Sequence, residues 1–138
     1  MKIQSYLFFN GNCDEAFKFY EQTLRGKITL KMSNAEAPTG QQMPGMTDQL
    51  LLHVRLEVGD QVLLGSDCPP GTYDVPQGFS VSLGVSSIAE AERLFKALAE
   101  GGTVKMPIAE CRIPARRNSG STAVRRARVA FRRIQDLR

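Results

Sequence analysis

The order of hydrophobic and polar positions predicts a strand–helix–strand pattern that occurs twice. The first copy begins with an apolar run at residues 3–9 and an Asn-Gly turn, and a helix is predicted over about 13–25. Asn12 and Glu15 have the spacing of a capping box, and Gly26 is predicted to end the helix in the left-handed conformation. The apolar face of this helix consists of Ala16, Phe17, Tyr20 and Leu24.

Further strand-like segments follow the first copy. Residues 28–32 read as a strand, and the loop at 33–48 is rich in Gly, Pro and Met, as in functional lids or disordered segments. Segments 50–57 and 61–64 read as a hairpin with a Gly-Asp turn, and a linker runs from 65 to about 78. The first module is therefore predicted to have the order βαβββ.

The second copy starts in the same way and then breaks off. A strand with strict alternation is predicted at 79–85, and Ser87 with Glu90 forms a regular capping box at the start of a helix. Another strand begins at 103–106, but no second hairpin follows. The apolar face of the second helix consists of Ala91, Leu94, Phe95 and Leu98. We therefore expect an α+β protein divided into a first module (1–76), a truncated second module (77–110) and a divergent arginine-rich tail (111–138).

Composition favours a cytoplasmic protein with no membrane partner. The three cysteines are odd in number and scattered, without a CxxC pair, and the N-terminal residues lead directly into a strand rather than a signal peptide. The longest apolar runs are far shorter than the roughly 20 residues that span a bilayer. A reduced, soluble protein is the expectation.

The net charge of +4 at pH 7 belongs to the tail. Residues 1–110 contain nine Lys and Arg against thirteen Asp and Glu, whereas residues 111–138 contain nine Arg and one Asp. Nucleic-acid binding is therefore predicted only through the tail. That tail could be a basic amphipathic helix with Val124, Ala127, Phe131 and Ile134 on one face, a disordered extension, or the product of a reading-frame change.

Five stretches of the chain resemble the PhnB-like branch of the vicinal oxygen chelate superfamily, which includes glyoxalase I, bleomycin resistance proteins and extradiol dioxygenases. The branch is also labelled 3-demethylubiquinone-9 3-methyltransferase-like. The resemblance implies paired βαβββ modules that form a cupped mixed sheet, here with a second module incomplete after about residue 110. It also implies homodimerisation and a small-molecule ligand inside the cup. The stretches are residues 6–17, 53–56, 65–67, 78–83 and 89–95.

The resemblance further implies a divalent metal held by His and Glu side chains, and a lyase or oxidoreductase activity. The matching positions fall near Gln4 or Ser5, near Leu64 or Gly65, and near Ser80, where no side chain is a good metal ligand. The fourth ligand would come from a strand that the second module lacks. We therefore predict no metal ligands and no cofactor, and we assign no catalytic residue.

Four residues are the candidates for ligand binding. His53, the only histidine, and Glu57 alternate along one predicted strand, and Tyr6 and Phe8 lie on the first strand. The alternative for His53 is a hydrogen-bonded residue at the rim of the cup. Asp67 is expected to form a turn.

Two further residues have side chains that could contact a ligand or react, but other interpretations are favoured for both. The spacing of Tyr20 favours core packing over ligand contact. Cys68 has no neighbouring histidine or basic residue in the sequence that would lower its pKa, which argues against a reactive thiol.

These observations predict a small-molecule-binding or enzyme-type protein. The alternatives are a nucleic-acid-binding protein that uses the tail, and an inactive relic of a frameshift. The frameshift interpretation rests on the family's usual ending, because one choice of codons for residues 122–130, read one base later, spells a similar sequence.

Overall fold

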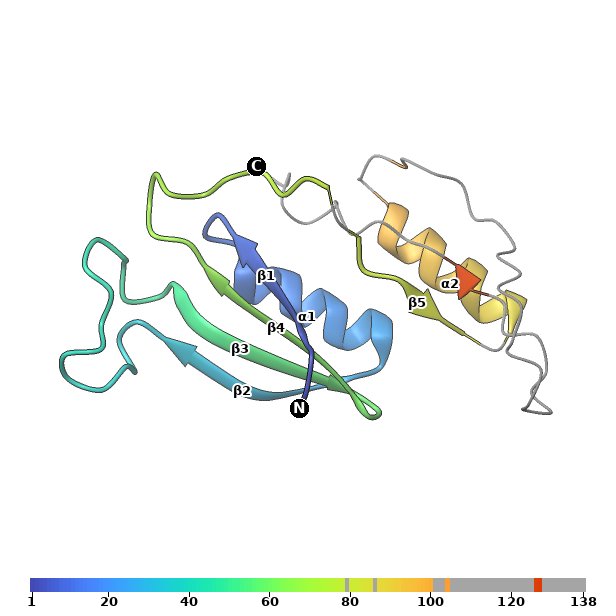
Figure 1. Cartoon of the computed structure of the whole chain (residues 1–138), viewed down its shortest axis with the longest axis horizontal. Coiled ribbons are helices and arrows are strands. Elements are labelled where there is room, and N and C mark those ends of the chain that lie inside the picture. The colour runs from blue at the N-terminus through green and yellow to red at the C-terminus, as the bar shows by residue number, and fades with distance from the viewer. Residues whose placement is uncertain (79, 86, 101–103, 105–125, 128–138) are drawn as a thin grey trace. The chain divides into compact units, whose positions relative to one another are not determined.

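The chain divides into two compact units, Met1–Pro76 and Gln77–Arg138 (Figure 1). The structure is a computed structural model that describes residues 1–78, 80–85, 87–100, 104 and 126–127. Among the described residues, no helix is long and apolar enough to cross a membrane. Each unit is described by itself below.

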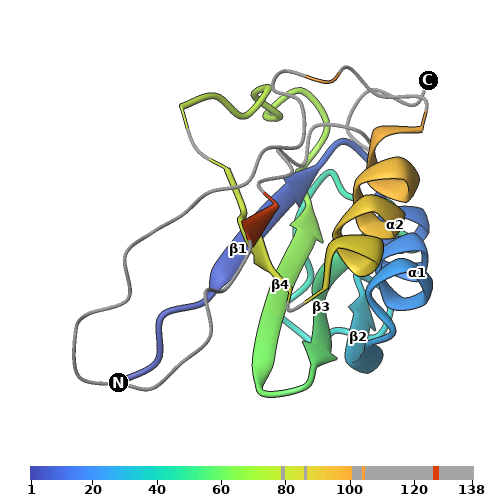
Figure 2. The same cartoon turned by 90° about the vertical axis from the view of Figure 1, so that its right-hand side faces the viewer.

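The first unit is a four-stranded mixed sheet with one helix on one of its faces. Its elements are β1 (Ser5–Phe9), α1 (Cys13–Leu24), β2 (Lys27–Ser33), β3 (Leu51–Val58) and β4 (Gln61–Asp67). The strand order is β1-β4-β3-β2, in which β1 runs parallel to β4 and the other neighbours are antiparallel (Figures 1 and 2). The predicted α+β class and the βαβββ order of the first module are confirmed.

The core of the first unit lies between α1 and the sheet. Alternate residues of each strand face the helix, because successive side chains of a strand point to opposite faces. The rings of Phe9 and Phe17 meet edge to face at 5.9 Å, and Tyr20 packs against Phe17 at 5.8 Å with only 3% of its surface exposed. The predicted core position of Tyr20 is therefore confirmed. The other fully buried side chains of this core include Leu56, Val54 and Cys13.

Both ends of α1 differ from the sequence-based predictions. The side chain of Asn12 does not cap the helix; the backbone N–H of Cys13 donates instead to Oδ1 of Asp67, at 3.0 Å. At the other end the left-handed residue is Arg25, with φ 55°, and not Gly26. Gly26 is needed for another reason, because a Cβ atom there would lie 2.6 Å from the backbone oxygen of Glu57. Local spacing cannot reveal either partner, since both come from distant strands.

The loop between β2 and β3 is organised around one buried side chain. Asn34 is 5% exposed; its Nδ2 donates to the backbone oxygen of Met46 at 3.0 Å, and its Oδ1 accepts from the backbone N–H of Met43 at 2.8 Å. Its own backbone N–H donates to the oxygen of Leu50 at 2.9 Å. An asparagine side chain can thus replace the missing strand partners of a loop backbone.

The hairpin of β3 and β4 is confirmed, including its Gly-Asp turn, in which Gly59 has φ 61°. The second strand of the hairpin is longer than predicted and continues to Asp67 instead of ending at Leu64. The extra residues remain in the sheet because they pair with β1, as in the register of Phe9 with Asp67.

The second unit contains β5 (Leu83–Gly84), α2 (Ile88–Ala99) and β6 (Arg126–Ala127). The predicted capping box is confirmed at its first bond, since Oγ of Ser87 accepts from the backbone N–H of Glu90 at 3.1 Å. The strand β5 is shorter than the predicted 79–85 and pairs antiparallel with β6. The helical alternative for the tail is wrong at Arg126–Ala127, which form a strand. The remaining predictions for the tail lie outside the described residues.

Candidate functional site

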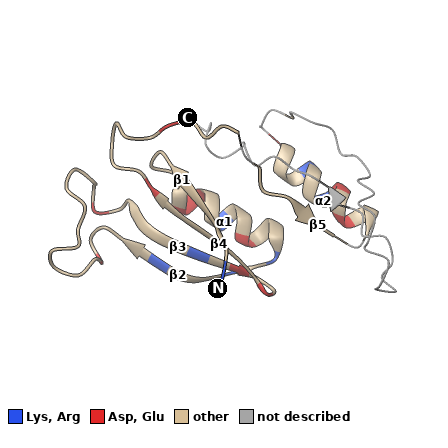
Figure 3. Cartoon of the chain, in the orientation of Figure 1, with Lys and Arg blue, Asp and Glu red and all other residues tan. Residues whose placement is uncertain are grey.

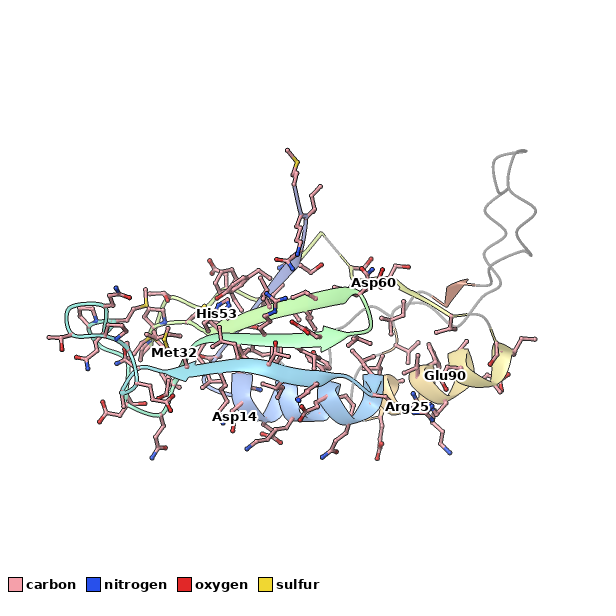
Figure 4. The ribbon with its side chains drawn as sticks, turned by 90° about the horizontal axis from the view of Figure 1, so that it is seen from below. Asp14, Arg25, Met32, His53, Asp60 and Glu90 are labelled. Atoms are coloured by element: carbon pink, nitrogen blue, oxygen red, sulfur yellow. The ribbon has the colours of Figure 1, made fainter. Side chains whose placement is uncertain are left out.

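The face of the sheet opposite α1 carries the four candidate residues. On β1, Tyr6 and Phe8 are 36% and 51% exposed, whereas their neighbours Leu7 and Phe9 are buried against the helix side. On β3, His53 and Glu57 are half-buried and alternate with buried Val54 and Leu56. Figure 4 shows α1 along one side of the sheet and His53 on the other. We call this surface the open face.

Tyr6 and His53 form the central contact of the open face. The hydroxyl oxygen of Tyr6 lies 3.2 Å from Nδ1 of His53, and the two ring centres are 5.7 Å apart. The ring of Phe8 lies 5.1 Å from that of Tyr6. Because β4 separates β1 from β3, the Tyr6 side chain reaches across one strand, with Leu64 as its register partner. The fold therefore brings three of the four predicted residues into one aromatic cluster.

Glu57, the fourth candidate, belongs to a separate polar group on the same face. Its Oε1 accepts from Nη2 of Arg55 at 2.8 Å, from Nε of Arg55 at 2.9 Å, and from Oγ1 of Thr29 at 3.3 Å. Both charged side chains are more than a third exposed, so the pair contributes about 1 kcal/mol or less to stability. Its main consequence is electrostatic, because the carboxylate is neutralised by its own neighbour. Both signs of charge occur across the first unit (Figure 3).

Apolar residues surround these polar groups. The strand register places Met32 of β2 opposite His53, and Leu30 of β2 opposite Arg55. Leu64 of β4 is paired with Arg55 from the other side, and Leu30 is 48% exposed. An open face of this composition offers apolar contact area with a few fixed hydrogen-bonding groups, as small-molecule sites commonly do.

In the first unit, the side chains at the positions implied for metal ligands do not fit a divalent metal. The positions that the superfamily resemblance assigned to ligands in the first unit hold Gln4, Ser5, Leu64 and Gly65, which offer neither imidazole nor carboxylate. Within the described part of the chain, no three His, Cys, Asp or Glu side chains are grouped closely enough to hold a metal ion.

Asp67 holds the start of the strand that carries His53, a role that the sequence did not predict. It is 5% exposed; one carboxylate oxygen accepts from the backbone N–H of Cys13, and the other from that of Leu51, at 2.9 Å. Leu51 is the first residue of β3, two positions before His53. The expected turn-forming role is therefore wrong: the carboxylate fixes the start of α1 to the start of the strand that carries His53.

Neither cysteine of the first unit has the environment of a reactive thiol. Burial raises the pKa of the Cys13 thiol far above its usual range, and the nearby carboxylates of Asp67 and Asp14 add to the effect. Burial and the carboxylates of Asp67 and Asp74 also raise the pKa of Cys68. Since the thiolate is the reactive form, both cysteines are poorly activated at neutral pH.

We expect this difference in burial to appear in thiol labelling. In a Cys111→Ser background at about pH 8, a thiol reagent should modify half-buried Cys68 slowly and Cys13 only after unfolding by denaturant. Because both pKa values are raised, the Cys68 rate should keep increasing as the pH passes the ordinary thiol range of about 8.5. Fast labelling of Cys13 in the folded protein would contradict the buried position.

The sequence identifies the family of the chain. The chain belongs to the family described as 3-demethylubiquinone-9 3-methyltransferase, whose sequence model matches residues 1–115. The resemblance to the PhnB-like branch is thereby confirmed.

Individual relatives are similar to this chain over most of its length. The chain is similar to the crystal structure of protein PA1353 from Pseudomonas aeruginosa, with 44% identity and a TM-score of 0.72 over 80% of this chain and 81% of that one. It is 28% identical to Protein YjdN of Escherichia coli, over 77% of this chain and 78% of the relative. A Bacillus cereus structure described as a putative 3-demethylubiquinone-9 3-methyltransferase, PhnB protein, shares the fold. Its TM-score is 0.64 at 21% identity, over 78% of this chain and 81% of that one.

Proposed function

We propose that the protein binds a small organic molecule on the open face of its first unit, with a flat apolar part of the ligand against Tyr6 and Phe8. The observation that carries the proposal is the aromatic cluster of Tyr6, Phe8 and His53. Large aromatic side chains that remain exposed on a sheet face, around a fixed pair of polar groups, are typical of ligand recognition.

The alternation of the strands supports this proposal. The first unit buries its core residues on the side of α1, whereas Tyr6 and Phe8 lie on the opposite face. These two rings are therefore not part of that core. The ring centres of Tyr6 and Phe8 are 5.1 Å apart and the rings are tilted by 40°, so each ring offers its own face to a flat ligand. His53 lies beside these rings and can form a directional hydrogen bond with the ligand. Such a bond favours flat molecules that have a polar atom at the matching position.

The proposal concerns recognition of one ligand. The methyl transfer that the family description names would also require a methyl donor beside the acceptor, and the proposal does not extend to that reaction. His53 is the only histidine of the chain, and like Tyr6 and Glu57 on this face it has a side chain of a type that can transfer protons. Homodimerisation and the cytoplasmic location stay predictions.

Replacing Phe8 with Ser should weaken ligand binding about tenfold or more, because it removes one of the two stacking rings. Flat aromatic fragments would be titrated into ¹⁵N-labelled protein, with amide chemical shifts recorded by NMR. We expect the largest changes at Tyr6, His53 and Leu64, and dissociation constants that increase in the variant.

The matched control is Lys18→Ala on α1. Lys18 is 60% exposed and pairs with Asp14, at 2.7 Å, within the helix. This variant should bind the same fragments as tightly as the unchanged protein. Shift changes confined to α1, or equal binding by the Phe8 variant, would contradict the proposed site.

A further inference from the structure

The contact between Tyr6 and His53 determines which ring nitrogen of the histidine faces a ligand. A neutral imidazole carries one proton, and a nitrogen that accepts a hydrogen bond cannot be the one that carries it. If Nδ1 accepts from the Tyr6 hydroxyl across the observed 3.2 Å, the proton lies on Nε2. His53 then presents an N–H donor away from Tyr6 in both its neutral and its charged state.

The charges around His53 favour an acidic ligand. On β3 itself the charged groups of this face are Arg55 and Glu57, which neutralise each other. From β1 the only titratable neighbour is Tyr6, the partner from β2 is Met32, and β4 contributes Leu64 without charge. Glu57 therefore does not repel an anion, and His53 is the group on this face whose charge can respond to one.

We infer that the open face recognises a flat conjugated acid, bound as its anion, with the Nε2–H of His53 donating to an oxygen of the ligand. Tyr6 is the positioning residue of this pair, since its hydroxyl holds the imidazole while its ring and that of Phe8 contact the flat part of the ligand. Binding of the anion favours the protonated imidazole, so it is accompanied by proton uptake. The inference rests on the proposed function and adds the ligand class to it.

The sign of the pH dependence follows from this linkage. Histidines change charge between about pH 5 and pH 8, and the protonated form attracts an anion more strongly. The affinity for the anion must therefore be highest at the acidic end of this range and decrease as the pH rises. A neutral ligand of the same shape experiences no such change.

Benzoate and benzamide are matched probes for this test, because they share one shape and differ in charge. Benzoate stays ionised throughout, since carboxylic acids titrate near pH 4. We expect its dissociation constant to increase about tenfold or more from about pH 5.5 to about pH 8, while that of benzamide changes less than about twofold. Binding of benzoate should also favour the protonated imidazole, with the proton taken up from the solvent, and NMR of ¹⁵N-labelled histidine detects this change at the single histidine.

Two variants separate the roles of the pair. His53→Gln should lose the pH dependence for benzoate, because a glutamine side chain does not change charge in this pH range. Tyr6→Phe keeps the ring and should bind benzoate about threefold or more weakly at about pH 5.5, because the hydroxyl that holds the imidazole is lost. The Lys18→Ala variant should keep the full pH profile.

The outcomes distinguish this inference from the proposed function. If both probes bind the open face but benzoate shows no pH dependence, or if the dependence persists in His53→Gln, the inference about acids is wrong and the proposed function stands. If neither probe perturbs the open face, both are wrong.

Discussion

Replacing Asp67 with Ala is expected to reduce the free energy of unfolding by about 3 kcal/mol, the largest loss from any single polar side chain of the first unit. The buried carboxylate accepts from two backbone N–H groups, those of Cys13 and Leu51, and both would lose their partner at once. The first bond is the cap of α1, and the second fixes the start of β3. Urea unfolding followed by circular dichroism measures the change.

Two control variants test the cause of this loss. Asp67→Asn keeps the shape and one acceptor oxygen, so its loss should be about half as large. Asp60→Ala removes an exposed carboxylate that accepts from the side chain of Gln61, and it should change stability by less than about 0.5 kcal/mol. Equal stability of the Asp67→Ala and Asp60→Ala proteins would show that the buried carboxylate is not the link we describe.

The same variant also tests the support of the open face. Because Leu51 precedes His53 by two residues, loss of the Leu51 bond should loosen the position of the imidazole relative to Tyr6. We expect weaker fragment binding by Asp67→Ala even under conditions in which the protein remains folded.

Replacing Gly26 with Ala should reduce the free energy of unfolding by about 2–3 kcal/mol, because the added methyl group has no space. Its Cβ would lie 2.6 Å from the backbone oxygen of Glu57, 2.8 Å from Cγ2 of Val58 and 2.9 Å from Cδ1 of Leu56. A backbone oxygen in a paired strand cannot move aside without disturbing the register of β2 and β3. Urea unfolding of the variant measures the change in the free energy of unfolding.

The neighbouring residue provides the contrast. Arg25 has φ 55°, a conformation that is unfavourable for residues with a Cβ, so Arg25→Gly should keep or increase stability, by up to about 1 kcal/mol. If Gly26 were the left-handed residue, as the sequence pattern predicted, Arg25→Gly would instead reduce stability. A stable Gly26→Ala protein together with a destabilised Arg25→Gly protein would reverse our assignment.

The elements of the first unit could be predicted because their signals are local. Helical spacing located α1 and the core position of Tyr20, and the Gly-Asp turn located the hairpin of β3 and β4. At Ser87 the capping box predicted the start of α2 for the same reason, since all of its partners lie within three residues. Where a distant residue supplied the partner, as Asp67 does for the cap of α1, the local pattern gave the wrong residue.

The candidate site was predicted as a set of residues but not as an arrangement. Period-2 alternation places His53 and Glu57 on one strand face, and Tyr6 and Phe8 lie on another strand. The contact of Tyr6 with His53 depends on the parallel pairing of β1 with β4, which joins segments more than 50 residues apart. Glu57 shares that strand face with His53, yet its contacts are with Arg55 and Thr29.

By itself the sequence determined which segments form helices and strands, and which side chains of each strand share a face. These properties follow from short-range backbone and side-chain periodicity, which any local window of the chain contains. The tertiary structure decided how the strands are ordered, and therefore that Tyr6 meets His53 across β4 and that Asp67 joins α1 to β3. The physical reason is that strand order is set by long-range pairing and by burial against α1, and neither is encoded within any one segment.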